Sequence, residues 1–592
     1  MESNWENKLI VASIDFGTTF TGCAFSMLAD YQTYREKIMT IHWKSGVSEQ
    51  ATKTPTILLL KKDLSFESFG YEAEETFAEI TEDSDDVDDW HYFKYFKMKL
   101  YDENKDSKIR TTSKVTDQNG REIDALHVIS VSIKFIKDKI MDELKARIGV
   151  LRDDDVYFVL TCPAIWSDNA KRFMRTAAEK AGIANDHLRI GLEPECAAIY
   201  LHNVTLPDLS ASKKQSFCMA HGDAYLIVDL GGGTVDIAAH KINGLGRFEE
   251  ILIPDGGPWG SININFKFEQ ALTALSGARA LETFRRENMH DYTALMRAFE
   301  LKKIAFPGTR SKVTMQLPIT YLQCHQNENR DSLLDSIKEV AHTVFSQCSF
   351  QPKNNVISFP NDSFASLYDE TIGLILDKVR TILEYLEKVK QHDIKTIFCV
   401  GGFADCKLLR KRFTDEFGDR VIAPSEAITA IMKGAVMFGR DENIIEFRIS
   451  RFTYGLDWSV DFDSKIHDPK RKEVTESGDV CKDIFYTIAE MGQRIPTDYA
   501  TKKIESFVKA SSQDRMEFPF YRTEKVQAPL YIDDPGCSLM GSMIVGLDDT
   551  AGGLDRYVTL EVYFGASELR AEATDNKGKK HTVAFNLDES EP

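Results

Sequence analysis

Two glycine turns, each set between apolar runs typical of β-strands, constrain the fold of this 592-residue chain more than any other feature. The first turn reads Asp15-Phe16-Gly17-Thr18-Thr19, and the second reads Asp229-Leu230-Gly231-Gly232-Gly233-Thr234. Both have the order strand, carboxylate, glycine, threonine, strand. The repeat predicts two similar lobes that face one another across a single cleft.

The residue types in these turns favour a site for a metal-bound polyphosphate. Glycine lets backbone N–H groups approach a phosphate closely, and threonine adds hydroxyl donors. Asp15 and Asp229 are anionic, so they would hold Mg²⁺, usually through water, and the metal would neutralise phosphate charge. A plain β-hairpin explains one such turn, but three successive glycines weaken a strand and need a reason such as close ligand approach. Gly401-Gly402 ends a third apolar run in a similar way.

Composition and missing motifs exclude several other classes of function. The chain carries 73 basic and 92 acidic residues, a net charge of −19, so nucleic acid is not expected as a main partner. Neither the Gly-x-x-x-x-Gly-Lys-(Ser/Thr) loop nor a Gly-x-Gly-x-x-Gly turn after a strand is present. The ten cysteines form no Cys-x-x-Cys pair, which argues against zinc. The first residues lack a secretory pattern and no run approaches the ~20 apolar residues of a membrane span, so we expect a cytoplasmic protein, with a nuclear location possible.

Hydrophobic periodicity predicts an α/β protein followed by a β-rich part. Apolar residues at helical spacing predict helices over 125–148 and 364–389, and a third helix is expected over 168–181. Apolar runs at 156–160, 226–228 and 397–400 predict strands, and the alternation of strands with helices implies an α/β core. After about residue 444 the pattern alternates with period two, and Asp575 to Gly578 has the composition of a hairpin turn.

Five segments, in this order, resemble the actin-like ATPase superfamily, and more specifically the seventy-kilodalton heat-shock chaperone family. They are IDFGTTFTG at 14–22, YFVLTCPAIWSDNAKRFMRTAAEKAGI at 157–183, LEPECAAIY at 192–200, LIVDLGGGTVDIA at 226–238 and VGGFADCKLL at 400–409. Two further segments, YFKYFKMKL at 92–100 and AITAIMKGAVMFG at 427–439, are similar to the divergent twelfth subfamily.

The resemblance implies a domain layout. A two-lobed actin-like, ribonuclease H-like nucleotide-binding domain would occupy 8–443, with lobe I at 8–222 and lobe II at 223–443. A mainly antiparallel, β-rich module similar to the family's substrate-binding sandwich would occupy 448–592, without the family's helical lid. The segment 443–448 stands where the family has its interdomain linker, but it lacks the acidic, leucine-rich character of that linker.

The resemblance also implies ATP or ADP and Mg²⁺ as cofactors and assigns roles to residues. Asp15 and Asp229 would hold the metal through water, and the two turns would cradle the phosphates through Gly17, Thr18, Thr19, Gly231, Gly232, Gly233 and Thr234. Lys97 would position the attacking water, and Glu193, before Pro194, would support metal-bound water. The catalytic set is thus Lys97, Glu193, Asp229 and Thr234. The alternative for Lys97 is a solvated lysine, like its neighbours Lys94 and Lys99.

The nucleoside end departs from the family. Glu300 and Lys303 keep the carboxylate and lysine expected at the ribose, although pairs with this spacing are also common on helix surfaces. Gly401 and Gly402 are kept, but Ile304 replaces an arginine, and Phe403 and Asp405 follow where a hydroxyl residue and another arginine are usual. The hypothesis from the sequence is that Phe403 or Ile304 packs the base.

Three functions remain open at this stage. The first is an ATP-binding, chaperone-like protein with slow hydrolysis, whose partners would be unfolded client proteins and co-chaperones. The second is a protein-interaction module that binds nucleotide without turnover. The third is a small-molecule kinase, because sugar and glycerol kinases share the superfamily.

Overall fold

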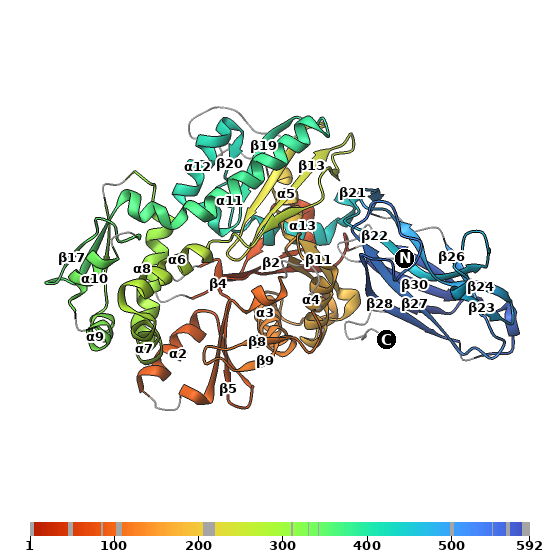
Figure 1. The fold of residues 1–592 in the computed structure, drawn as a ribbon, viewed down its shortest axis with the longest axis horizontal. Coiled ribbons are helices and arrows are strands. Elements are labelled where there is room, and N and C mark those ends of the chain that lie inside the picture. The colour runs from red at the N-terminus through yellow and green to blue at the C-terminus, as the bar shows by residue number, and fades with distance from the viewer. Residues whose placement is uncertain are drawn as a thin grey trace.

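The computed structural model describes residues 5–44, 51–83, 87–101, 109–204, 220–309, 312–329, 331–340, 343–497, 503–547, 549–563 and 569–582. It confirms a mixed α/β fold with several sheets (Figure 1). The division into two lobes, and the boundary between 443 and 448, stay predictions.

The first glycine turn belongs to a six-stranded sheet in the order β11-β10-β1-β2-β3, with β4 paired to β2. Its strands are β1 (Ile10–Phe16), β2 (Phe20–Met27), β3 (Met39–Thr40), β4 (Lys53–Pro55), β10 (Val156–Cys162) and β11 (Leu188–Leu192). β1 runs antiparallel to β2 and parallel to β10. Every residue of β1 and β10 is buried, as the apolar runs predicted. The predicted helices α3 (Ala125–Ile148) and α4 (Asp168–Lys180) pack on one face of this sheet.

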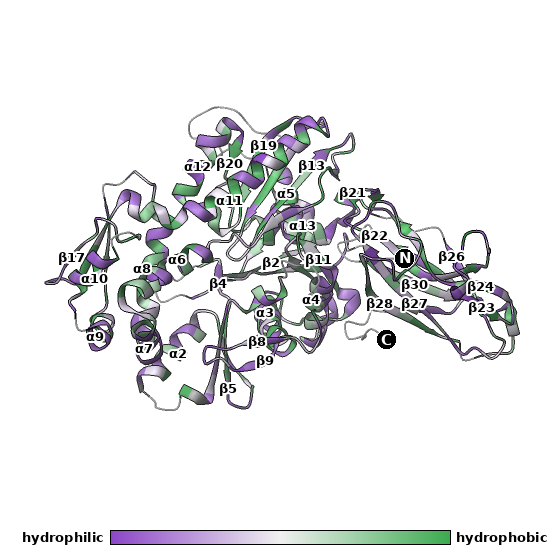
Figure 2. Ribbon diagram, viewed as in Figure 1, coloured by the Kyte–Doolittle hydropathy of each residue, from purple (hydrophilic) through white to green (hydrophobic). Residues whose placement is uncertain are grey.

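The second glycine turn belongs to an eight-stranded sheet with the same pairing plan. β12 runs antiparallel to β13 and parallel to β19, in the order β20-β19-β12-β13-β14-β21-β25, with β15 on β13. The strands are β12 (Ala224–Leu230), β13 (Val235–Ile242), β14 (Phe248–Glu250), β15 (Asp255–Gly257), β19 (Ile394–Val400), β20 (Val421–Ile422), β21 (Ile445–Ile449) and β25 (Arg494–Pro496). The helices α6 (Ile262–Ser276), α8 (Met289–Ala305), α11 (Asn361–Lys388) and α12 (Lys407–Phe417) share its core. Surface helices such as α11 alternate between hydrophobic and hydrophilic residues (Figure 2).

Two helices, α5 (Glu193–Asn203) and α13 (Ala430–Arg440), lie between these sheets. They share one buried cluster with Val11 of β1 and with Phe398 of β19. The two helices touch at Gly434, where an added Cβ atom would lie 1.7 Å from the carbonyl oxygen of Cys196. This close packing matters for the site because α5 begins at Glu193.

An acidic segment that the sequence indicates as a solvated surface or loop, residues 72–89, is largely helical. Helix α2 (Tyr71–Asp83) covers most of it, because Ala73 and Phe77, four residues apart, both face the interior and are buried. Several further helices and strands lie between residues 28 and 360. They are α1 (Leu28–Thr33), β5 (Ile57–Lys61), β6 (Phe66–Phe69), β7 (Trp90–Lys94), β8 (Lys114–Thr116), β9 (Glu122–Asp124), α7 (Ala278–Glu287), β16 (Lys312–Gln316), α9 (Ile319–Glu328), α10 (Leu333–Glu339), β17 (Ser349–Gln351) and β18 (Val356–Pro360).

Apart from β25, the strands after residue 452 form two antiparallel sheets around a core of their own. One sheet contains β22 (Thr453–Asp461), β23 (Lys472–Thr475), β24 (Gly478–Ala489), β27 (Arg515–Thr523) and β28 (Cys537–Gly546), and the other contains β26 (Ile504–Phe507), β29 (Tyr557–Tyr563), β30 (Arg570–Asp575) and β31 (Lys580–Thr582). The predicted hairpin turn joins β30 and β31, with the Gly578 N–H donating to the Asp575 carbonyl oxygen at 2.9 Å. The alternating residues after 582 lie outside the described residues.

The segment expected to be a linker is not a free connection. Its residues enter β21, which pairs with β14 in parallel and with β25 antiparallel. Ile445 is fully buried there and belongs to the cluster between the two large sheets. The second large sheet therefore includes strands from both sides of the predicted domain boundary.

The contact between α5 and α13 gives a test of the fold. We expect Gly434→Ala to lower the free energy of unfolding by about 1–3 kcal/mol, because the new methyl group would force the two helices apart. Gly373→Ala is the matched control, since a Cβ atom at this position of α11 meets nothing within 4 Å. It should stabilise the chain by up to ~1 kcal/mol through helix propensity. Urea denaturation followed by tryptophan fluorescence measures both, and equal effects would contradict the packing argument.

Candidate functional site

The two glycine turns meet in space. A Cβ atom on Gly232 would lie 2.1 Å from the Thr19 hydroxyl oxygen, and one on Gly233 would lie 2.7 Å from the Thr18 hydroxyl oxygen. Any larger residue in the second turn would therefore displace the first. The glycines allow the hydroxyl groups of Thr18 and Thr19 to approach the second turn closely, although the two turns lie far apart in the sequence.

The carboxylates of both turns are buried at this point. Asp15 is 2% exposed and Asp229 is 3% exposed. Asp15 Oδ2 forms an ion pair with Lys53 Nζ at 2.6 Å, whereas Asp229 Oδ1 has no hydrogen-bond partner among the described residues. Burial, followed by repulsion from Glu193, Asp236 and Asp15, raises the pKa of Asp229 well above its usual value. Asp15 and Asp229 thus belong to one electrostatic cluster, as the paired turns predict.

Lys97 and Glu193 form a buried ion pair beside this cluster. Lys97 comes from the short 3-10 helix Phe96–Leu100 and is 1% exposed, so it is not the solvated lysine that the sequence left as an alternative. Its Nζ lies 3.1 Å from Glu193 Oε1 and 4.8 Å from the centroid of the Trp166 ring. Burial alone would lower the pKa of Lys97, but attraction to Glu193 outweighs it and the net pKa is raised. Burial raises the pKa of Glu193 to about 7 even with Lys97 beside it.

The donor set fits a hydrated magnesium ion better than a directly bound one. Among the described residues, no group of three His, Cys, Asp or Glu side chains is arranged to coordinate a metal ion directly. Yet burial raises the pKa of Glu193, Asp229 and Asp236, and repulsion from neighbouring carboxylates, Asp15 included, raises the pKa of Glu193 and Asp229 further. A hydrated divalent cation would relieve this repulsion and give Asp229 Oδ1 a water partner.

Backbone hydrogen bonds connect the second turn to the residues expected at a ribose. The N–H groups of Gly260 and Ser261, at the start of α6, donate to the carbonyl oxygens of Gly233 and Gly231 at 3.0 and 3.2 Å. Lys303 Nζ, on α8, donates to the Ser261 carbonyl oxygen at 3.2 Å and pairs with Glu300 Oε2 at 2.7 Å. Burial lowers the pKa of Lys303 despite this carboxylate.

Sequence reasoning missed two residues of this group. Asn265 donates from Nδ2 to Glu300 Oε2 at 3.0 Å and accepts from Lys303 Nζ at 2.8 Å, and Ser261 supplies the carbonyl oxygen just described. The signal in the sequence was the glycine-rich stretch from Gly256 to Gly260, which directly precedes α6. Lys303 is thus buried under a partly exposed Glu300, so this pair is not an ordinary surface pair of a helix.

The third turn contributes through Gly401 only. An added Cβ atom at Gly401 would lie 2.4 Å from Asp229 Oδ1, so this glycine packs against the carboxylate, whereas Gly402 is exposed. Phe403 is 3% exposed and packs in the core under the second large sheet. The hypothesis that Phe403 packs a base is therefore not supported, because its ring is already enclosed.

Ile304, the other residue expected to pack the base, remains accessible. Ile304 is 37% exposed. Arg410, which sequence reasoning did not single out, folds back from α12 and donates to the Ala404 carbonyl oxygen and to Asp405. An arginine is thus present near this turn, but its guanidinium is held by the turn itself.

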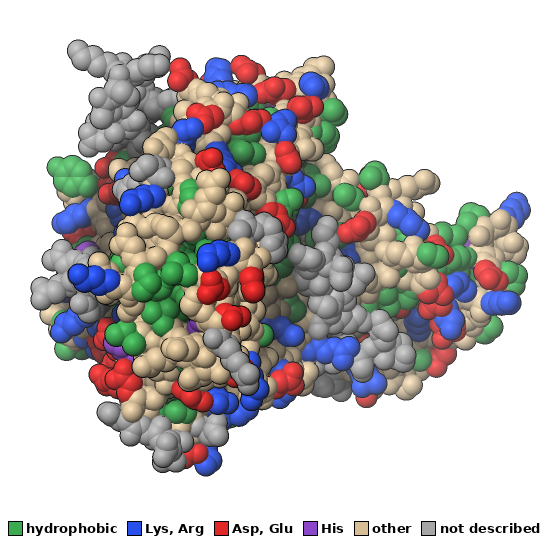
Figure 3. Space-filling view, turned by 60° about the vertical axis from the view of Figure 1, so that its left-hand side comes forward, with side chains coloured by type: hydrophobic (Ala, Val, Ile, Leu, Met, Phe, Trp, Pro, Cys, Tyr) green, Lys and Arg blue, Asp and Glu red, His purple; other side chains and the backbone are tan. Residues whose placement is uncertain are grey.

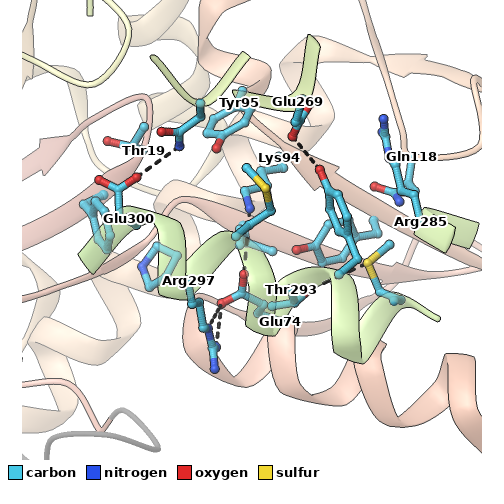
Figure 4. A pocket seen from close by; sticks show the side chains of 18 of the residues that line it. Thr19, Glu74, Lys94, Tyr95, Gln118, Glu269, Arg285, Thr293, Arg297 and Glu300 are labelled. Atoms are coloured by element: carbon cyan, nitrogen blue, oxygen red, sulfur yellow. Dashed lines mark hydrogen bonds and ion pairs between the residues drawn. The ribbon is translucent and has the colours of Figure 1, made fainter. Parts of the chain in front are cut away.

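A cavity of about 450 Å³ opens beside the two turns. It lies between α2 and β7 on one side and α6 and α8 on the other, and Thr19, Ser261, Asn265 and Glu300 line one end of it. Figure 4 shows Thr19 and Glu300 together at that end, with Gln118 and Arg285 at the opposite side. The cavity therefore begins where the phosphate and ribose residues meet.

The surface is of mixed charge. On the face shown in Figure 3, basic side chains are interspersed with acidic ones and do not form a continuous basic area, while hydrophobic side chains gather near its centre. Across the described residues, no helix combines the length and the apolar character that crossing a bilayer requires.

Comparison with known proteins identifies similar chains. Heat shock 70 kDa protein 12A from Mus musculus is 29% identical over 626 aligned residues, which cover 97% of this chain and 90% of that protein. Heat shock 70 kDa protein 12B from Homo sapiens is 28% identical, with 97% and 91% covered. Chaperone protein DnaK from Picrophilus torridus is 24% identical over 55% of this chain and 46% of its own length.

A family model described as a domain of unknown function (DUF8340) matches residues 220–421, which include the second glycine turn and the Glu300–Lys303 pair. The resemblance read from the sequence motifs agrees with the named relatives, and it extends over nearly the whole chain. Over nearly its whole length, this chain is thus similar to proteins named heat shock 70 kDa protein 12A and 12B, and over about half of it to a chaperone named DnaK.

Proposed function

We propose that this chain binds Mg²⁺–ATP where the two glycine turns meet, and that it acts as a chaperone-like protein with slow ATP hydrolysis. The observation that carries the proposal is the contact between the two turns around buried, mutually repelling carboxylates. A cluster of this kind costs folding free energy unless a cation neutralises it. The similarity to proteins named heat shock 70 kDa protein 12A and DnaK also supports a chaperone-like, nucleotide-binding protein.

The phosphates would lie between the hydroxyl groups and backbone N–H groups of the two turns. Thr18 and Thr19 would contribute from one side and the stretch Gly231 to Thr234 from the other, with Gly17 allowing close approach. Asp15 and Asp229 would accept hydrogen bonds from water in the magnesium shell. Magnesium, when bound, would neutralise charge on the β- and γ-phosphates.

Lys97 and Glu193 would act on the attacking water. The Lys97 ammonium would attract the water and the γ-phosphate oxygens, because it is buried and its charge is only partly neutralised by Glu193. Glu193 would accept a hydrogen bond from a metal-bound water. Catalysis would thus consist of positioning and charge stabilisation, as expected for phosphoryl transfer.

The two antiparallel sheets after residue 452 would bind unfolded client proteins, with the nucleotide-binding domain at 8–443 and the client-binding module at 448–592. Co-chaperones and a cytoplasmic or nuclear location belong to this proposal. The two parts are in contact: Arg448 forms a bidentate ion pair with Glu195 at 2.5 and 2.8 Å, and the Tyr454 hydroxyl donates to Asp168 at 3.1 Å.

Asp229→Asn tests the magnesium site. The substitution removes a carboxyl group whose ionised form is disfavoured by burial and by nearby carboxylates, so we expect the nucleotide-free chain to melt at a higher temperature than the wild type at neutral pH. Mg²⁺–ATP at 100 times its Kd should stabilise the wild type by about 2.7 kcal/mol and the variant hardly at all. Thermal denaturation with and without Mg²⁺–ATP measures both effects.

Asp457→Asn is the matched control for this experiment. Burial raises the pKa of Asp457 to about 6, but this residue lies on β22, away from the turns. Its variant should keep the full stabilisation by Mg²⁺–ATP. If Asp229→Asn also keeps it, the magnesium site is not where we place it.

Proton release tests the electrostatics of Glu193. Its pKa of about 7 lies above the usual value for a glutamate side chain, so the protonated form stabilises the nucleotide-free fold below the unfolded pKa, and this contribution is lost as pH rises through 7. A cation favours the ionised form. Binding of Mg²⁺–ATP at neutral pH should therefore release protons, and the affinity should rise between about pH 6 and 8.

Calorimetry in buffers of different ionisation enthalpy counts these protons. Glu193→Gln should reduce the release, while Glu250→Gln should not, although burial also raises the pKa of Glu250 to about 7. Glu250 accepts a hydrogen bond from the Ile449 N–H at 2.6 Å and does not face the turns. Equal loss in both variants would assign the protons elsewhere.

Phosphate release separates hydrolysis from binding alone. If the chain is an ATPase, Lys97→Ala should lower turnover by roughly 10²–10³-fold with little change in ATP affinity, because the ammonium acts mainly on the transition state. Lys99→Ala, at an exposed neighbouring position, is the control and should leave turnover unchanged.

Turnover should also increase when an unfolded protein client is added. No turnover in the wild type would favour the interaction module, and stimulation by a polyol would favour a kinase.

A further inference from the structure

Lys53 reaches the site from the third strand of a row. β4, which contains Lys53, pairs with β2, and β2 pairs with β1. In this register Asp15, Gly22 and Lys53 lie directly opposite one another, so they share one face of the sheet. A Cβ atom on Gly22 would lie 2.8 Å from Lys53 Cγ, so this glycine leaves room for the lysine stem to cross β2. The register of the sheet therefore brings an ammonium group to the carboxylate of the first turn.

The backbone that follows Lys53 supports the first glycine turn. The Thr56 N–H donates to the Thr19 carbonyl oxygen at 2.8 Å, and the Thr56 hydroxyl donates to the Gly17 carbonyl oxygen at 2.8 Å. Both acceptors belong to the turn that would hold the phosphates. One short segment of the chain thus positions Lys53 and this turn together.

The ammonium of Lys53 can bind a second anion. Among the described residues its Nζ donates one hydrogen bond, to Asp15 Oδ2 at 2.6 Å, and an ammonium has three donors. The side chain of Lys53 is 13% exposed, whereas that of Lys97 is 1% exposed. Solvent, and therefore a ligand, reaches Lys53 more easily than Lys97.

The charge of Lys53 acts on the carboxylates of both turns. Burial and nearby carboxylates raise the pKa of Asp229, whereas the positive charge of Lys53 acts in the opposite direction. Without nucleotide, Lys53 thus supplies part of the positive charge that the carboxylates require. A hydrated magnesium ion beside Asp15 and Asp229 would repel the ammonium, because like charges a few ångströms apart disfavour each other in a buried site. The flexible stem of a lysine lets its ammonium move to another anion.

We propose that Lys53 is a polyphosphate-binding residue that exchanges one anion for another when nucleotide binds. In the nucleotide-free chain its ammonium neutralises Asp15. With Mg²⁺–ATP bound, Asp15 accepts hydrogen bonds from metal-held water and the Lys53 ammonium donates to phosphate oxygens. The inference rests on the proposed binding of nucleotide at the two turns. The alternative is a structural counter-ion, which would stay on Asp15 in both states.

Two probes, Mg²⁺ alone and Mg²⁺–tripolyphosphate, test this exchange in the full chain. Lys53→Met removes the charge and keeps an unbranched stem. Mg²⁺ alone should raise the melting temperature of this variant more than that of the wild type, because Asp15 is no longer neutralised. By calorimetry, Mg²⁺–tripolyphosphate should bind the variant at least about tenfold more weakly, the effect of losing one hydrogen bond between charged groups.

Lys61→Met is the matched control. Lys61 lies on β5 and its Nζ pairs with Glu67 Oε2 at 3.0 Å, an ion pair outside the carboxylate cluster. This change should alter neither measurement. A structural counter-ion would give a different result for Lys53→Met, because the variant would then bind tripolyphosphate as the wild type does. That outcome overturns the inference, whatever the effect of Mg²⁺ alone.

A measurement on the wild type keeps the inference testable if Lys53→Met does not fold. Acetic anhydride acetylates lysine amines, and mass spectrometry of the peptides measures the extent at each residue. Mg²⁺ alone should increase the reactivity of Lys53, because it releases the ammonium from Asp15, and Mg²⁺–tripolyphosphate should decrease it. Lys61 should react equally in all conditions. Undiminished reactivity of Lys53, at a tripolyphosphate concentration that stabilises the chain against heat, would place its ammonium away from the phosphates.

Binding of Mg²⁺–ATP by the wild type tests the proposed function separately. If the wild type binds Mg²⁺–ATP and Lys53→Met binds it equally well, the nucleotide site stands and the role of Lys53 falls. If the wild type binds neither Mg²⁺–ATP nor Mg²⁺–tripolyphosphate, the proposed function fails and the inference falls with it.

Discussion

Mutual repulsion among buried carboxylates is the constraint on which the arrangement of the site depends. The four groups are Asp15, Glu193, Asp229 and Asp236, each at most 8% exposed. Two lysines, Lys53 and Lys97, form ion pairs within this group. Desolvation raises the pKa of Glu193, Asp229 and Asp236, and like charge adds to this shift at Glu193 and Asp229. The fold thus holds these carboxyl groups in a place where their ionised forms are disfavoured.

The surrounding fold keeps these groups together by rigid contacts. Asp15 lies on β1 and Asp229 on β12, each the first strand of an antiparallel hairpin, and Glu193 begins a helix that packs closely against α13 at Gly434. The Ser13 hydroxyl, two residues before Asp15, donates to the Met432 carbonyl oxygen of α13 at 2.6 Å. The same pair of helices therefore fixes both β1 and the start of α5. Relaxation of the carboxylates away from one another would break tightly packed contacts.

Features that depend on local pattern could be predicted from the sequence. The apolar runs of β1 and β12 and the helical spacing of α3 and α11 are properties of neighbouring residues, and the structure contains each element. The repetition of the turn sequence also predicted that the two turns would face one another. The acidic residues of α2 were misleading, since their number outweighed the short apolar face of Ala73 and Phe77.

Features that depend on distant partners could not be predicted in this way. The strand β21 exists because β14, about two hundred residues earlier, offers an edge on which it pairs. The burial of Lys97 depends on Glu193 and Trp166, and Asn265 gains its role only from Glu300 on another helix. Phe403 follows a glycine turn, as a ligand contact would, but the core beneath the second sheet encloses it. In each case the residue type is evident from the sequence, but the residues that surround it depend on the three-dimensional fold.

The same dependence on distant partners joins the C-terminal sheets to the site. Arg451, just after β21, donates to the carbonyl oxygens of Ala164 and Trp166, and the Trp166 ring lies 4.8 Å from Lys97 Nζ. Ala164, Ile165 and Trp166 form a short turn, in which the Ile165 N–H donates to an Asp236 carboxylate oxygen at 2.9 Å. This turn thus contacts a carboxylate of the cluster, the buried lysine and the arginine that precedes the C-terminal sheets. Because the turn contacts all three groups, a displacement of Arg451 would shift Trp166, whose ring lies against Lys97. No flexible segment would intervene.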